Sequence, residues 1–235
     1  MVEENSGQIQ AARYGMLSEV VLLMAKTADL QRLLKQLINK VKWVLDFERS
    51  TLAFLNEDGE SYSLQTLLET RRTVPPVNLD RVPLTDCLPG NVMTTRQLRL
   101  FTDLEKAKEI VKNPSDPYLF DGSLATILSL PLQAYGKILG AITFASSKVD
   151  GYNREDIKVA TTIATHLALS VDRWQQTEQL QRANEELARL ASFPELNPGP
   201  IIEVGLDGKV YYVNPAGEIL FPDCEQAGTK HPLLA

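Results

Sequence analysis

Residues 153–192 read NREDIKVATTIATHLALSVDRWQQTEQLQRANEELARLAS and contain neither glycine nor proline. Gly151 precedes this run, and Pro194, Pro198 and Pro200 follow it, so we predict a single helix between them. At about 1.5 Å per residue this helix would be on the order of 60 Å long, more than one compact domain uses. We therefore expect the helix to leave the domain in which it begins.

The two halves of this predicted helix differ in composition. The first half carries the small and apolar residues of a packed core, among them Ile157, Ala160, Ile163, Ala164, Leu167, Val171 and Trp174. The second half is charged and polar, and its apolar residues are reduced to a narrow seam at Leu180, Leu187 and Leu190. The change predicts a helix that packs inside one domain and then pairs with a second copy as a coiled coil.

The spacing of residues along the helix predicts the interface of a homodimer. Its members are Ile163, Leu167, Trp174, Leu180, Asn184 and Leu187. Seam residues before and after Trp174 are spaced alternately three and four residues apart. The two runs join through two successive spacings of three residues, a stammer that overwinds a coiled coil. Asn184 lies at an a-type position between d-type Leu180 and Leu187, where a polar residue fixes a parallel register. The alternative is a surface helix with a few leucines.

Composition narrows the classes of function. Net charge is -6, with a hydrophobic fraction of 44% and a charged fraction of 23%, as in an ordinary globular protein. An acidic chain without a concentrated basic face argues against nucleic acid as a partner. The N-terminus is polar and acidic, and no apolar run reaches the roughly 20 residues of a membrane span. We therefore expect a cytoplasmic chain that does not itself cross a membrane.

No arrangement of residues in the sequence matches a catalytic or metal-binding motif. The two cysteines, Cys87 and Cys224, are far apart and lack CxxC spacing, so a reduced pair is expected. Neither His166 nor His231 belongs to a ligand cluster, and a packing role is expected for His166. The sequence predicts no metal site and no catalysis by this chain.

The rest of the chain alternates helical and strand patterns. Apolar spacing predicts helices over 8–25 and 30–45, and the period changes to two after Phe47. The other expected elements, in order, are strands at 50–56 and 61–68, a loop at 69–85, a short helix at 88–95, a short strand at 98–102, a helical turn and loop at 103–122, and strands at 124–132 and 137–146. Both faces of the last strand are apolar, which predicts a central strand covered on both sides.

Residues 27–173 resemble a GAF domain, a small-molecule-sensing module of bacterial signalling proteins. The resemblance rests on VPLTDCLPGNV at 82–92, SLPLQ at 129–133, ILGAITF at 138–144 and YNRED at 152–156. It implies an α+β fold with an antiparallel sheet of five or six strands, the terminal helices on one face and a ligand cavity under loops on the other. The final helix of this domain would begin at 153, after a separate N-terminal helix within 1–26.

The segment FPELNPGPIIEVGLDGKVYYVNPA at 193–216 resembles the start of a PAS domain. Two strands and a turn cannot bury a core alone, so we expect 193–235 to be an incomplete PAS-like domain. Residues 174–192 would then form a coiled-coil signalling helix between the two modules. This layout implies a fragment of a longer protein whose output domain, such as a histidine kinase or nucleotide cyclase, lies outside the chain.

The ligand of a GAF-like pocket is not evident from the residues. Placement on the expected strands and helix suggests a pocket near Tyr62, Cys87, Asn91, Thr126 and Ser129. Bilin-binding members use a cysteine, commonly next to a histidine, and 117–124 (PYLFDGSL) has neither, which argues against a covalent bilin. The cyclic-nucleotide pattern is matched only in part, by Lys148, Tyr152 and Asp156, and supports that ligand weakly. The cofactor stays unknown.

Three classes of function remain open. The first is a sensory module that binds a small molecule non-covalently and transmits through a parallel coiled coil. The second is a dimerisation or spacer module without a ligand, whose cavity is filled by side chains. The third is a catalytic relative such as a methionine-sulfoxide reductase, for which several cysteines near the pocket would be needed and only Cys87 is available.

Overall fold

A computed structural model describes residues 14–25, 27 and 29–223 of the chain. The chain divides into two compact units, Met1–Gln175 and Gln176–Ala235. The long helix α5 (Arg154–Leu196) begins in the first unit and ends in the second.

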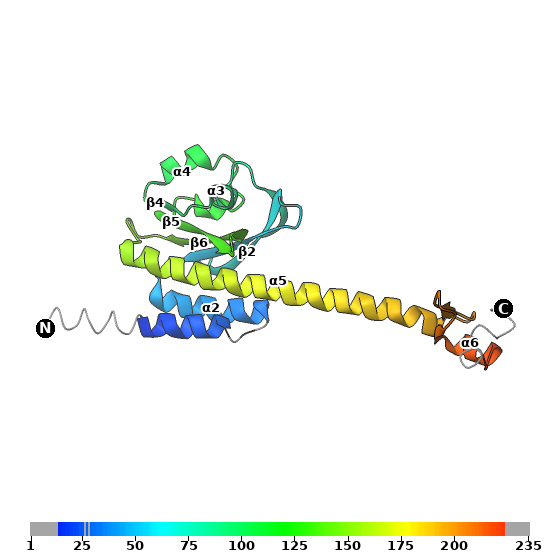
Figure 1. Ribbon diagram of the computed structural model, residues 1–235. Coiled ribbons are helices and arrows are strands. Elements are labelled where there is room, and N and C mark those ends of the chain that lie inside the picture. The colour runs from blue at the N-terminus through cyan, green and yellow to red at the C-terminus, as the bar shows by residue number, and fades with distance from the viewer. Residues whose placement is uncertain (1–13, 26, 28, 224–235) are drawn as a thin grey trace. The chain divides into compact units, whose positions relative to one another are not determined.

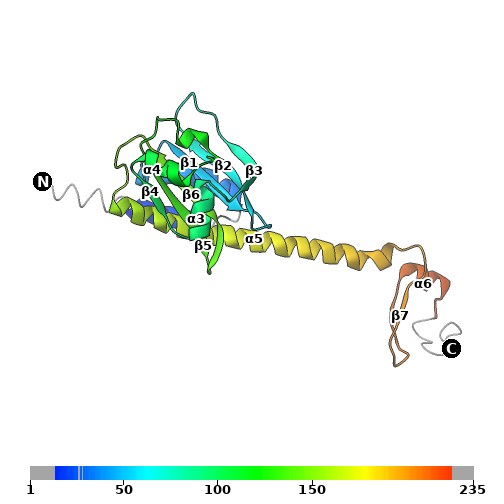
Figure 2. The ribbon, with the colours of Figure 1, turned by 90° about the horizontal axis from the view of Figure 1, so that it is seen from above.

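The first unit is built on a six-stranded antiparallel sheet with the strand order β3-β2-β1-β6-β5-β4 (Figure 2). Its strands are β1 (Arg49–Leu55), β2 (Ser61–Glu69), β3 (Asn78–Pro83), β4 (Arg99–Phe101), β5 (Thr126–Ala134) and β6 (Lys137–Ser146). Helices flank the sheet, which confirms the predicted α+β class. β6 lies in the middle of the sheet and is buried along all but its first residue, also as predicted.

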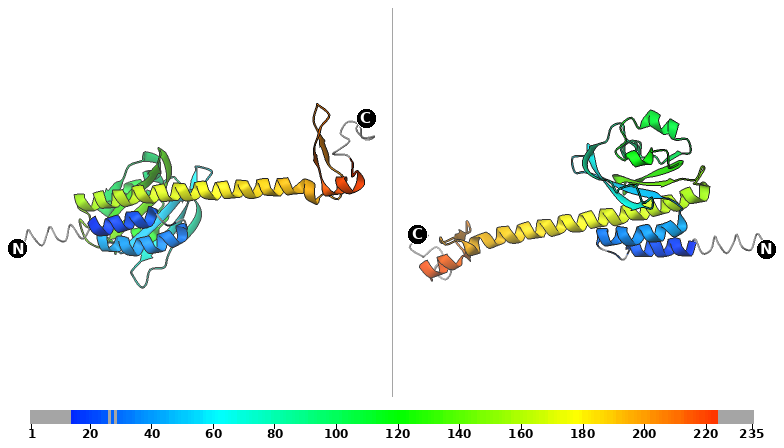
Figure 3. Two further views of the ribbon diagram at one scale, coloured as in Figure 1. Left: turned by 60° about the horizontal axis from the view of Figure 1, so that its bottom comes forward. Right: turned by 180° about the vertical axis from the view of Figure 1, so that it is seen from behind.

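Helices cover both faces of the sheet (Figure 1). The helix at 14–25, α2 (Leu30–Val44) and the first half of α5 lie side by side on one face (Figure 3). On the opposite face are α3 (Leu88–Thr95), α4 (Leu104–Ile110) and the short 3-10 helix η1 (Pro117–Leu119). Each face has its own apolar core, so the sheet separates two clusters of buried side chains.

The amphipathic pattern of α2 explains why it seals the first of these cores. Its buried residues are Leu30, Leu33, Leu34, Leu37, Ile38, Val41 and Val44. The Asp29 carboxylate accepts a hydrogen bond from the amide of Arg32 at 3.1 Å and caps the helix at its start. Full burial of each apolar side chain contributes about 1.5–3 kcal/mol, so this stripe supplies much of the driving force for packing.

The helix at 14–25 is fixed to α5 by polar contacts as well. The hydroxyl of Ser170 donates to the carbonyl of Met24 at 3.0 Å, and an Arg173 guanidinium nitrogen donates to the same carbonyl at 2.9 Å. These contacts satisfy a carbonyl at the end of the first helix. They also tie the N-terminal segment to the helix that leaves the domain.

Two predictions of secondary structure are wrong. Residues 69–85 were expected to form a loop, but 78–83 pair with β2 as β3. β3 is an edge strand with exposed side chains on both faces, so it carries no hydrophobic alternation. Helix α5 also continues past Pro194 to Leu196, although that proline lacks the amide that a helix interior requires.

The second unit contains the predicted hairpin, formed by β7 (Ile202–Val204) and β8 (Val210–Val213), followed by α6 (Pro215–Leu220). Asn214 is its polar centre and is fully buried. The side-chain oxygen of Asn214 accepts from the amides of Ile201 and Gly217, both at 2.8 Å. Its amide nitrogen donates to the carbonyls of Pro194 and Gly199, both at 2.9 Å. One side chain therefore joins the end of α5, the hairpin and α6.

Candidate functional site

Two of the five predicted pocket residues meet in the structure. Tyr62, on β2, donates from its hydroxyl to the Ser115 hydroxyl at 2.7 Å and lies 3.2 Å from the Cys87 sulfur. Cys87 occupies the N-cap position of α3 without a side-chain capping hydrogen bond, and its sulfur lies 3.4 Å from the carbonyl of Pro83. Burial, reinforced by the neighbouring thiol, raises the pKa of Tyr62 well above its ordinary value. The phenol therefore stays protonated and acts as a packed donor.

The side chains of the other three predicted residues pair with partners other than Tyr62 and Cys87, although the backbone amide of Asn91 donates to the Cys87 carbonyl at 3.0 Å. Asn91, on α3, accepts a hydrogen bond from Arg99 at 2.8 Å. Ser129 and Thr143 join β5 to β6 through their hydroxyls at 2.9 Å. Thr126 donates to the carbonyl of Lys148 at 2.7 Å and so holds the loop that leads to α5. These hydrogen bonds do not define a shared cavity.

The face under α3 and α4, where a cavity was expected, is filled by side chains. Its core cluster includes Tyr62, Leu88, Val92, Leu119 and Ile127, all nearly inaccessible to solvent. A gap between β1, α3 and η1 measures about 10 Å³ and is lined by residues such as Thr51, Leu64, Leu88 and Asp116. A space of about that size holds at most one water molecule. It does not admit a metabolite without movement of the walls.

A buried ion network closes this face, and few features of the sequence predict it. The guanidinium of Arg49, which is fully buried, donates to Asp116 at 2.7 and 2.9 Å and to Glu69 at 2.6 Å. Arg71 donates to the same Glu69 oxygen at 2.7 Å and to Asp121 at 3.1 Å. The network pins the loop at 113–123 onto the sheet. The available signal was an arginine at the start of a strand that is otherwise apolar.

The two carboxyl groups that Arg49 contacts respond differently to their surroundings. Burial raises the pKa of Asp116, and the hydrogen bonds and charge of Arg49 offset this only in part. Burial also acts to raise the pKa of Glu69, but hydrogen bonds from Arg71 and Arg49 outweigh it, so that pKa lies below its ordinary value. Asp116 is therefore the member of the network that depends most on Arg49 to remain charged.

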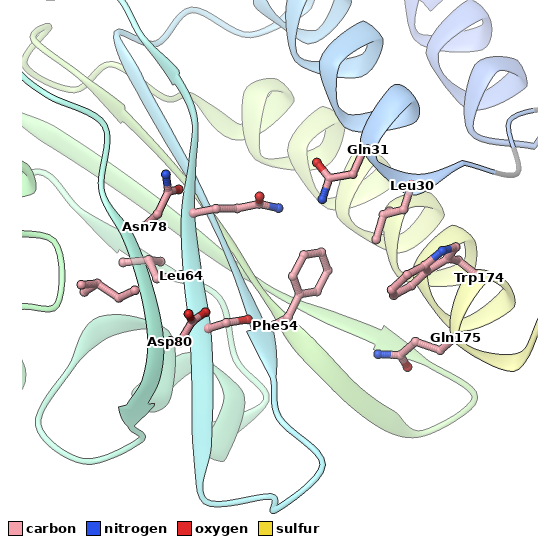
Figure 4. A pocket seen from close by; sticks show the side chains of 11 residues that line it. Leu30, Gln31, Phe54, Leu64, Asn78, Asp80, Trp174 and Gln175 are labelled. Atoms are coloured by element: carbon pink, nitrogen blue, oxygen red, sulfur yellow. The ribbon is translucent and has the colours of Figure 1, made fainter. Parts of the chain in front are cut away.

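A larger pocket lies on the opposite face of the sheet, at its β1–β2–β3 edge. Its volume is about 420 Å³, which is within the usual range for a small-molecule site. Figure 4 shows that its side chains come from α2, from α5 and from the strands, with Phe54 and Trp174 on the apolar side. Asn78 and Asp80 of β3 line the other side. None of the five predicted pocket residues lines it.

The predicted dimer residues fall into two groups. Ile163 and Leu167 are fully buried in the core of their own domain and are occupied there, so these two cannot lie at an interface between chains. Trp174 is half-buried and packs against the same core. Leu180 and Leu187 are each 63% exposed, and Asn184 is exposed as well. The exposed members of the predicted interface therefore all lie in the second half of α5.

The GAF domain family model matches residues 27–172. This chain belongs to the GAF domain family. A search of curated protein sequences finds no match to it.

Solved structures share the fold of this GAF domain at low sequence identity. The GAF domain of an Acinetobacter phosphoenolpyruvate-protein phosphotransferase aligns with a TM-score of 0.58 at 14% identity, over 70% of this chain and 95% of that one. The GAF domain of a Bacillus halodurans two-component sensor histidine kinase aligns at 0.53 and 17%, over 65% and 99%. A free methionine-R-sulfoxide reductase from Neisseria meningitidis aligns at 0.54 and 13%, over 71% and 92%.

Two absences hold for residues 14–25, 27 and 29–223, which the structure describes. In that part of the chain, no helix is both long and apolar enough to cross a membrane. Across the same ranges, no group of three or more histidine, cysteine, aspartate or glutamate side chains could hold a metal ion.

Proposed function

We propose that this GAF domain is the regulatory module of a signal-transduction protein, and that it transmits to an output domain through a parallel dimer formed by the second half of α5. The PAS-like segment at 193–235 would be the next module along the chain. The fold of a sensor histidine kinase GAF domain, named above, supports this signalling role. The output activity would be that of a kinase or nucleotide cyclase outside this chain.

The observation that carries the proposal is the change in burial along α5. The buried residues of this 43-residue helix all lie between Val159 and Asp172. Beyond them, the side chains of 181–190 are all exposed, including Leu187 and Leu190. An isolated helical segment of this length is marginal in water, because propensity alone scarcely offsets the cost of nucleation. Pairing with a second copy through Leu180 and Leu187 would supply the missing apolar contact.

The filled face favours a module that needs no ligand under α3. In the described part of this face the gap beside Asp116 measures about 10 Å³, and Tyr62 and Ser129 already hydrogen-bond within the chain, which supports a face packed without a metabolite. Of the first two classes of function given above, this supports the ligand-free one for that face. Regulation would then act through the packing of α5 on the sheet.

A regulatory role is also favoured over reductase chemistry. A thiol that attacks a substrate must be accessible and readily ionised. Cys87 is 2% exposed, and its sulfur is enclosed by Tyr62 and the carbonyls of Pro83 and Leu84. It is the free cysteine among the described residues, so no resolving thiol is found beside it there.

The dimer can be tested by sedimentation velocity of the full chain. We expect a dimer at tens of micromolar, and a monomer for the variant Leu180→Glu/Leu187→Glu, because two buried charges on each helix would oppose pairing. Leu206→Glu is the matched control: Leu206 is a fully exposed leucine of the hairpin turn, and its replacement should leave the dimer intact. A wild-type monomer at high micromolar concentration would refute the proposal.

A further inference from the structure

The pocket at the β1–β2–β3 edge of the sheet has walls of two kinds. Phe54 of β1 and Trp174 of α5 provide aromatic surface (Figure 4). Gln31 of α2, Gln65 of β2 and Asn78 of β3 add side-chain amides. A concave site with aromatic walls and a few convergent polar groups is the usual form of a small-molecule site.

The polar groups of this pocket are available to a ligand. Within the described part of the chain, no hydrogen bond or ion pair is found for the side chains of Gln31, Gln65, Asn78 and Asp80. This contrasts with the face under α3, where Tyr62 and the other polar side chains described above are already paired. The unpaired polar side chains therefore lie on the face that carries the pocket of about 420 Å³, and not on the face under α3.

The charge of the walls indicates what the ligand would be. Among the described residues, no lysine, arginine or histidine lines the pocket, and Asp80 is the only ionisable side chain that does. Phosphate and carboxylate ligands would be repelled by Asp80, and none of the described lining residues offers them a positive charge. A cation gains from the carboxylate and from the faces of Trp174 and Phe54, which attract positive charge. Amide oxygens accept hydrogen bonds from its N–H groups.

We propose that this pocket binds a small planar organic cation, of the amidine or guanidine class, between Asp80 and Trp174. The site lies beside the helix that leaves the domain, since Trp174 and Gln175 are both α5 residues. A ligand that contacts both β3 and α5 therefore stabilises one position of α5 relative to the sheet. The inference goes beyond the proposed dimer, because binding can be measured whether or not two chains pair.

The test uses three isosteric probes: benzamidine, a planar cation; benzamide, which is neutral; and benzoate, an anion. The chain has two tryptophans, and Trp43 is 76% exposed, so Trp43→Phe leaves Trp174 as the only tryptophan reporter at little structural cost. Saturable change of its fluorescence is expected with benzamidine, at a dissociation constant on the order of 1 mM for so small a probe. Benzamide should bind more weakly, and benzoate should not saturate.

Variants separate a specific site from unspecific contact. Asp80→Asn should weaken benzamidine about threefold, as expected for one exposed counter-charge, and leave benzamide unchanged. Glu109→Gln removes a similar exposed carboxylate from α4, on the opposite face, and should change neither. Absence of saturation by benzamidine would overturn the binding site. Equal binding of benzamidine and benzoate, or of benzamidine before and after Asp80→Asn, would overturn the assignment to a cation.

Discussion

Replacement of Arg49 by leucine should destabilise the first unit more than most single substitutions. Asp116 is 2% exposed, and in the variant it would lose the guanidinium that donates to it at 2.7 and 2.9 Å. Glu69 would keep its hydrogen bond from Arg71. Removal of one partner from a buried ion pair costs about 3–5 kcal/mol, because the remaining charge is stranded away from water. We expect Arg49→Leu to lose about that much free energy of unfolding at neutral pH.

Urea unfolding followed by tryptophan fluorescence measures this loss, since both tryptophans, Trp43 and Trp174, lie in the first unit. The double variant Arg49→Leu/Asp116→Leu should recover at least about 1 kcal/mol, because an apolar pair strands no charge. Arg72→Leu is the control, as Arg72 is exposed, and it should stay within about 0.5 kcal/mol of wild type.

The free energy of unfolding lost in Arg49→Leu should also depend on pH, and the direction of that dependence follows from the pKa of Asp116. Burial holds the pKa of Asp116 above its ordinary value, and removal of Arg49 should raise that pKa further. A carboxyl group whose pKa is higher in the folded state than in the unfolded state costs stability above the folded pKa; this cost shrinks as pH falls below the folded pKa and vanishes below the unfolded pKa. The difference between Arg49→Leu and wild type should therefore shrink from pH 7 toward about pH 5. A loss below about 1 kcal/mol at pH 7, or one that is independent of pH, would refute the reasoning.

Two further substitutions test close packing and the second unit. Gly140→Ala should cost roughly 3 kcal/mol in urea unfolding, because its new Cβ would lie 2.0 Å from the carbonyl oxygen of Ala53 on the neighbouring strand. Gly15→Ala, where nothing lies within 4 Å, should not destabilise, and an equal loss there would contradict the packing argument. Asn214→Ala should cost the second unit about 2–3 kcal/mol, because the buried amide of Gly217 loses its acceptor. Faster proteolysis of residues 197–220, with the first unit still resistant, is the expected result, and an unchanged cleavage rate would count against it.

The periodic elements of this protein could be read from its sequence because their signal is local. The stripe from Leu30 to Val44 predicts α2, since a helix with one buried face must repeat its apolar residues every three or four positions. The apolar run of β6 predicts a central strand for a similar reason. The strand β3 could not be predicted from apolar periodicity. It is an exposed edge strand, which is held by hydrogen bonds to its neighbour and not by side-chain burial.

Only the tertiary structure decided where the helix α5 stops serving its own domain. Heptad spacing runs through Ile163 and Leu187 alike, but the sheet and α2 bury the first, while the second is exposed. The same holds for the sites. Tyr62 and Cys87 lie 3.2 Å apart, but whether space remains beside them depends on how side chains from several elements fill one face. The spacing of residues along the chain does not encode the volume left beside Tyr62 and Cys87, because that volume is set by residues far apart in the sequence.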